Sequence, residues 1–173
     1  MAGTFYKHDI YCVLGIDPGK TGAVSIFEQT YTDSYDFYLD CIVDFDEYKI
    51  RQKIWDINNW EHVVAFVENV HAAPGQSVSA MFNFGQNFGW WKGMLDASNI
   101  PYISIAPQSW SPVMLGRTDD KKNKAREVAT QLFSRDLDTK VDPNGHSWFR
   151  LKKHDGRADS ALIGWYGIQK YLK

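Results

Sequence analysis

Leu14-Gly15-Ile16-Asp17-Pro18-Gly19-Lys20-Thr21-Gly22-Ala23-Val24 is the stretch that decides the fold of this chain. The apolar run before Asp17 predicts a buried strand, and Pro18 with Gly19 predicts a tight turn into a second strand. An aspartate between a buried strand and a glycine turn is half solvated and held in one direction, which suits a hard cation such as Mg²⁺. Taken alone, Asp-Pro-Gly would equally fit a solvated turn, where it is common.

Three more carboxylates occupy comparable positions. Residues 63–67 read as a buried strand that Glu68 follows directly, so Glu68 can meet Asp17 if the two strands are sheet neighbours. A helix predicted from Lys153 to Leu172 carries Asp155 and Asp159 four residues apart, on one face near its start. These two like charges repel unless a cation lies between them, although the helix dipole alone also favours acids there.

The hydrophobic pattern gives the order of the remaining elements. Strands are predicted at 10–16, 22–28, 36–43, 62–68 and 102–105, with a turn around Thr32 to Ser34. Helices are predicted at 46–59, 77–98, 121–133 and 153–172, with a short helix or turn from Pro107 through Trp110. This order predicts an α/β fold with a five-stranded mixed sheet and helices on both faces. The length of 173 residues fits a single domain spanning 1–173.

The order of these blocks resembles the RNase H-like nucleases and, within them, the RuvC family of Holliday junction resolvases. Gly15-Ile16-Asp17-Pro18-Gly19 matches the family's opening, and Val67-Glu68-Asn69-Val70-His71 matches its second acidic strand. Residues 79–89 match the helix that follows, and Ala158-Asp159-Ser160-Ala161-Leu162 matches the closing helix. The resemblance runs from about Tyr11 to Tyr171 and suggests a compact, phage-type member.

The resemblance implies a structure-selective endonuclease of DNA recombination and repair. Such an enzyme resolves four-way junctions by paired, symmetric, metal-dependent nicking and leaves a 5'-phosphate. It implies two Mg²⁺ ions per site, for which Mn²⁺ substitutes, and it gives the catalytic and metal-binding roles to Asp17, Glu68, Asp155 and Asp159. The best-known bacterial members space the last two acids three apart, whereas some organellar and viral relatives resemble the spacing of four. Because some members use a histidine at the weaker position, His154 is the alternative fourth ligand.

The charge distribution indicates which part of the chain would meet DNA. The formal net charge is -2, but residues 1–106 carry 6 Lys and Arg against 13 Asp and Glu, and residues 107–173 carry 13 against 8. Phosphate binding depends on local potential, so the basic C-terminal part is the candidate DNA face. The expected contacts are Arg117, Lys121, Lys122, Lys124, Lys153 and Arg157, together with His71, which stands where bacterial forms often place a wedging aromatic residue.

A glycine stripe marks the helix predicted at 77–98. Gly85, Gly89 and Gly93 recur every fourth residue, and each costs about 1 kcal/mol of helix stability relative to alanine. Close approach of another backbone would compensate this cost. Either the stripe packs on the protein's own sheet, or it forms the homodimer interface that the resemblance implies.

Several function classes are disfavoured by the sequence. No apolar run approaches the ~20 residues of a membrane span, and no signal peptide precedes the first strand. Cys12 and Cys41 fit buried thiols in a reducing cytoplasm, that of the host if the source is viral. No Gly-rich nucleotide loop is present, and the chain is too short for a two-domain sugar kinase or actin-like ATPase. Two alternatives stay open, namely a nuclease for other branched DNA or hybrids and a non-catalytic junction-binding module.

Overall fold

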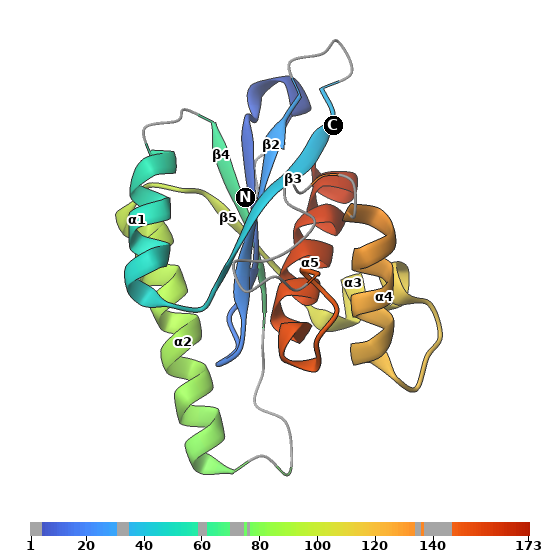
Figure 1. Ribbon diagram of the computed structural model, residues 1–173. Coiled ribbons are helices and arrows are strands. Elements are labelled where there is room, and N and C mark those ends of the chain that lie inside the picture. The colour runs from blue at the N-terminus through green and yellow to red at the C-terminus, as the bar shows by residue number, and fades with distance from the viewer. Residues whose placement is uncertain are drawn as a thin grey trace.

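A twisted five-stranded sheet runs through the centre of the computed structural model, which describes residues 5–30, 35–58, 62–69, 75, 77–133, 136 and 147–173 (Figure 1). The strand order is β3-β2-β1-β4-β5. β1 pairs antiparallel with β2 and β2 with β3, whereas β1 with β4 and β4 with β5 are parallel. The bounds are β1 Cys12–Asp17, β2 Ala23–Gln29, β3 Phe37–Asp44, β4 Val63–Glu68 and β5 Tyr102–Ile105. The predicted five-stranded mixed sheet is confirmed.

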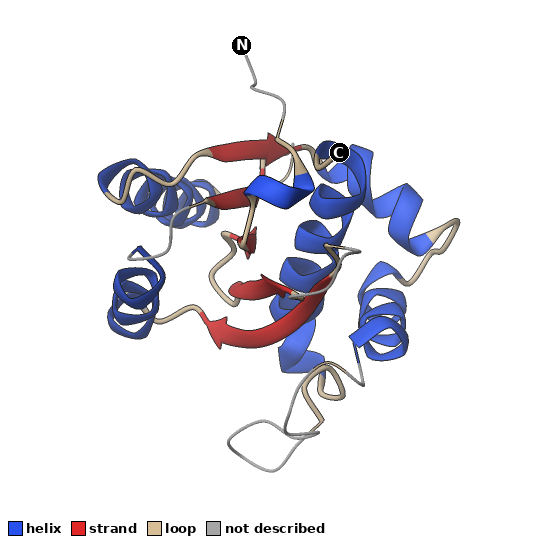
Figure 2. Ribbon diagram, turned by 90° about the horizontal axis from the view of Figure 1, so that it is seen from above, coloured by secondary structure: helices blue, strands red, loops and turns tan. Residues whose placement is uncertain are grey.

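Helices cover both faces of the sheet, as Figure 2 shows from above. The α-helices are α1 Glu47–Asn58, α2 Val78–Ala97, α3 Pro107–Leu115, α4 Lys121–Phe133 and α5 Asp155–Tyr171. One core cluster joins α1 and α2 to one face, and a second joins α3, α4 and α5 to the other. None of the helices in the described ranges is long and apolar enough to cross a membrane.

Most element bounds differ from the prediction by one or two residues, and two helices differ for a physical reason. α3 continues past Trp110 to Leu115 even though Pro112 lies inside it, because Trp110 and Leu115 are both buried and hold the extra turn against the core. The last helix begins at Asp155, since a short 3-10 turn, Lys152–His154, replaces its predicted first residues. The predicted turn around Thr32 to Ser34 and the loop residue His71 lie outside the described residues.

α5 lies unusually close to β1. A Cβ atom added at Gly15 of β1 would collide with the backbone of α5, where it would meet the nitrogen of Gly164 at 2.6 Å. One added at Gly156, in the first turn of α5, would collide with the backbone of Thr21 in the turn after β1. Only glycine permits this approach of helix to strand, and the approach brings the start of α5 to the end of β1.

Candidate functional site

Two of the predicted acids end neighbouring strands. Asp17 is the last residue of β1, and its Oδ1 accepts a hydrogen bond from the Gly19 N–H at 2.9 Å, so the glycine turn orients the carboxylate. Glu68 is the last residue of β4, and its Oε1 accepts from Nε1 of Trp110 at 2.8 Å. Since β1 and β4 are parallel neighbours, both carboxylates lie at the same end of the sheet.

The four predicted acids lie near enough to one another to interact electrostatically. Burial and then repulsion from Asp155 raise the pKa of Asp17 to about 6, against the lowering effects of the Gly19 hydrogen bond and of Lys122. Burial and then repulsion from Asp17 raise the pKa of Glu68 to about 7, against the lowering effect of the Trp110 hydrogen bond. Burial, followed by repulsion from the other three acids, raises the pKa of Asp159 well above its usual range. We refer to Asp17, Glu68, Asp155 and Asp159 as the carboxylate cluster.

Asp155 differs from the other three because it is paired with cations. Its carboxylate binds Arg126 and lies 3.4 Å from Nζ of Lys122, both on α4. These ion pairs tie the first residue of α5 to the basic helix. His154, the alternative fourth ligand, is buried, and its Nδ1 accepts from the Leu151 N–H at 3.4 Å. The choice between Asp155 and His154 stays a prediction.

The donors of the cluster suit a hard divalent cation. All four donors are carboxylates, the ligands that a hard divalent cation prefers. Mutual repulsion disfavours ionisation of all of them together. In the described part of the chain, no Lys or Arg forms an ion pair with Asp17, Glu68 or Asp159. As the side chains stand, however, no three His, Cys, Asp or Glu among the described residues form a group that could hold a metal ion. The chemistry therefore fits such a cation, but its ligand set is not assembled.

A cavity of about 340 Å³ opens beside the cluster. Glu68 and Asp159 line it together with Lys121 and Lys122 of α4, which are two of the predicted phosphate contacts. α3 contributes much of the remaining wall, including Gln108 and Trp110. Carboxylates on one side and ammonium groups on another would suit a phosphate that approaches with a cation.

The other predicted DNA contacts differ in exposure. Arg117 and Lys153 are exposed, and Lys124 forms a surface ion pair of 3.1 Å with Glu127. His71 lies outside the described residues. The phosphate contacts of the exposed residues stay predictions.

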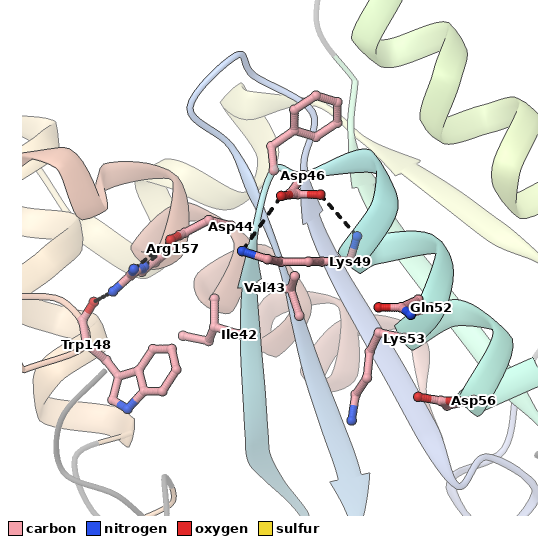
Figure 3. A pocket seen from close by; sticks show the side chains of 11 residues that line it. Ile42, Val43, Asp44, Asp46, Lys49, Gln52, Lys53, Asp56, Trp148 and Arg157 are labelled. Carbon is pink, nitrogen blue, oxygen red and sulfur yellow. Dashed lines mark hydrogen bonds and ion pairs between the residues drawn. The ribbon is translucent and has the colours of Figure 1, made fainter. Parts of the chain in front are cut away.

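Arg157 is turned inward instead. Its side chain is 6% exposed, and it holds both oxygens of Asp44, at the end of β3, with two hydrogen bonds of 2.6 Å. The guanidinium also donates to the Trp148 carbonyl at 3.4 Å and lies 5.4 Å from the centre of its ring. Figure 3 shows these residues on the wall of a separate cavity of about 700 Å³ between β3 and α1. Arg157 thus anchors α5 to the edge strand, although it was predicted to contact phosphate.

The glycine stripe does not pack against the protein's own sheet. Gly85, Gly89 and Gly93 are exposed, and a Cβ atom added at any of them would have no described atom within 4 Å. Val78 and Phe82, at helical spacing on the same side of α2, are also exposed. Of the two readings of the stripe, contact with the sheet is wrong, and the subunit interface stays a prediction.

The sequence did not predict the roles of two further residues, Trp110 and Asp44. A tryptophan in a short helix reads as core, and Asp44 at a strand end gave no sign of its arginine partner. Only the tertiary placement of α3 and α5 shows what these two side chains contact.

No protein-family model matches this chain, and no curated protein matches it. Its fold is similar to solved structures of junction resolvases. The RuvC structure from Thermus thermophilus matches with a TM-score of 0.57 and 13% identity, covering 91% of this chain and 95% of that one. The fowlpox virus Holliday junction resolvase matches with 0.58 and 19%, covering 91% and 98%. The yeast mitochondrial resolvase Ydc2 matches with 0.52 and 16%, covering 94% and 78%. At these identities the likeness establishes a shared fold, as the sequence motifs predicted.

Proposed function

We propose that this chain is a structure-selective endonuclease that resolves four-way DNA junctions. The observation that carries the proposal is the carboxylate cluster. Asp17 and Glu68 end neighbouring parallel strands, Glu68 and Asp159 line one cavity, and burial followed by repulsion from acids of the cluster raises the pKa of all three. Two structures of similar fold contain junction DNA, namely Thermus thermophilus RuvC with a Holliday junction substrate and the fowlpox resolvase with substrate junction DNA. We take residues 1–173 as one nuclease domain.

In the proposed reaction the cluster holds two Mg²⁺ or Mn²⁺ ions. Bound there, the ions would supply Lewis-acid stabilisation of charge on the scissile phosphodiester and favour attack by water, leaving a 5'-phosphate. Asp17, which ends the strand next to that of Glu68, would serve both ions, while Glu68 and Asp159 would each favour one. Lys121 and Lys122 would bind the phosphate in the neighbouring cavity.

Symmetric cutting of a junction calls for two active sites. A four-way junction has two-fold symmetry, so a two-fold homodimer can cut opposing strands in pairs. The exposed stripe on α2, Val78, Phe82, Gly85, Gly89 and Gly93, is the proposed contact between the subunits. The free thiols Cys12 and Cys41 are compatible with a reducing cytoplasm, where we place the protein.

A cleavage assay with four substrates tests the proposal. Wild-type protein in Mg²⁺ should nick a four-way junction in preference to a flap, an RNA-DNA hybrid and a plain duplex of the same sequence. Asp17→Asn should abolish nicking while junction binding stays near wild type, because the substitution removes a charge and keeps the shape. Asp56→Asn, at an exposed position on α1, is the matched control and should cut normally. Tight junction binding without cutting by wild type would favour a binding module, and preferential cutting of hybrids or flaps would assign a different nuclease.

A further inference from the structure

Trp110 is the closest neutral partner of the carboxylate cluster. The residue is 4% exposed, and its Nε1 donates a hydrogen bond to Oε1 of Glu68 at 2.8 Å. The contact depends on sheet register, because Glu68 pairs with Ile105 at the end of β5 and α3 starts two residues later at Pro107. Trp110, one turn into α3, therefore lies beside Glu68.

A neutral donor suits this position better than a cation would. A hydrogen bond from an N–H group to a carboxylate favours its charged form, which is the form that binds metal. Unlike Lys or Arg, the indole brings no positive charge that would compete with a divalent ion. Only Oε1 is engaged, since no described residue donates to the second oxygen, Oε2.

We infer that Trp110 is a positioning residue that fixes Glu68 through Oε1 and leaves Oε2 for a divalent cation. The inference rests on the proposed function and extends it to the outer shell of the metal site. Partners that orient a ligand from behind commonly change metal affinity about 10- to 100-fold when they are removed. The same loss of affinity is expected here when the indole N–H is removed.

The chain offers a matched control for this test. Trp91, on α2 against the other face of the sheet, is fully buried, and its Nε1 has no hydrogen-bond partner among the described residues. Trp110→Phe and Trp91→Phe both replace a buried indole by a phenyl ring, but only Trp110→Phe removes a bond to a carboxylate. Both variants should unfold at lower temperature without metal, because each leaves a cavity.

The decisive measurement is the Mg²⁺ concentration that gives half of the maximal metal-induced rise in unfolding temperature. Trp110→Phe should need about 10- to 100-fold more Mg²⁺ than wild type, and Trp91→Phe should need the wild-type concentration. In a double-mutant cycle, Trp110→Phe should have little further effect once Glu68→Gln is present, because the two changes damage the same ligand. Junction cleavage by Trp110→Phe should recover at high Mg²⁺.

Three outcomes would overturn the inference. These are a wild-type Mg²⁺ midpoint in Trp110→Phe, an equal shift in Trp91→Phe, and full additivity with Glu68→Gln. If Trp110→Phe fails to fold, benzothienylalanine at position 110 keeps the shape of the indole and removes only the N–H, and the same midpoints apply. A wild-type protein that neither responds to Mg²⁺ nor cuts junctions would overturn the proposed function as well, whereas an active wild type with an unaffected Trp110→Phe would overturn this inference alone.

Discussion

Asp17→Asn is expected to stabilise the metal-free protein at pH 8, although it removes the central acid of the site. In the folded protein the pKa of Asp17 rises from 3.8 to about 6, chiefly through burial and then repulsion from Asp155. The folded state therefore holds the proton more tightly than the unfolded state. Holding the Asp17 carboxylate in its buried site therefore costs little folding free energy at a pH below the unfolded pKa near 3.8. The cost is complete above about pH 6, where the carboxylate is ionised in the folded state as well.

The size of the effect follows from the same shift. A rise of about two pKa units corresponds to about 3 kcal/mol of unfolding free energy, at 1.36 kcal/mol per unit. Asparagine keeps the oxygen that accepts the Gly19 N–H, so the orienting turn survives. The substitution also removes the repulsion that Asp17 exerts on Glu68 and Asp159, which acts in the same direction, whereas the loss of attraction to Lys122 opposes the gain.

Urea denaturation in EDTA, followed by tryptophan fluorescence, measures this difference. The unfolding free energy of Asp17→Asn should exceed that of wild type by about 3 kcal/mol at pH 8, but by only about 0.5 kcal/mol at pH 4, where the folded carboxyl is protonated. Exposed Asp56→Asn should match wild type at both values. Saturating Mg²⁺ should remove much of this difference, because the metal stabilises wild type more than the mutant. A mutant that is no more stable than wild type at pH 8, or equally more stable at both values, would refute the electrostatic reasoning.

Three further predictions concern the fourth ligand, the DNA face and the dimer. Asp155→Asn should lower cleavage strongly and His154→Ala should mainly lower the unfolding temperature; the reverse pattern in a cleavage assay and a thermal melt would reassign the fourth ligand. Lys121→Ala should reduce the slope of log affinity for a junction against log salt by about one unit, whereas an unchanged slope would remove Lys121 from the phosphate contacts. Gly89→Leu has room in the isolated subunit and should gain helix propensity of roughly 1 kcal/mol, so it should fold as a monomer that nicks without paired incisions. Sedimentation of wild type and mutant measures this, and a wild-type monomer at micromolar concentration would contradict the dimer.

Strand ends and helix faces could be predicted from the sequence, because burial of one face produces a regular spacing of apolar residues along the chain. The apolar runs before Asp17 and Glu68 located each acid at a strand end, and the parallel pairing of β1 with β4 puts both at the same end of the sheet. The spacing of Asp155 and Asp159 placed them on one face of α5. The same helical periodicity also indicates which side of α5 Arg157 occupies. At 100° per residue, Arg157 lies about 200° from Asp155, on the opposite side of the helix, where it meets Asp44.

Contacts between segments far apart in the sequence could not be predicted from the local spacing of apolar residues. The hydrogen bond from Trp110 to Glu68 depends on where β5 ends relative to β4, and no property of Trp110 alone indicates it. The stripe of Gly85, Gly89 and Gly93 predicted close approach of another backbone, but it did not indicate whether the sheet or another chain would supply that backbone. Pairing of Asp155 with Arg126 likewise required the docking of α4 on α5.

The close contact of β1 with α5 at Gly15 makes evolutionary constraint differ between the glycine positions and the apolar core. Because Gly15 lies directly against the backbone of α5, the offset between Asp17 and Asp159 is set by main chain resting on main chain. Exchanges among the apolar side chains of the core can then accumulate without changing that offset, whereas a single methyl group at Gly15 would wedge helix and strand apart. We therefore expect selection to be most severe at Gly15 and Gly156, which contribute no side chain at all.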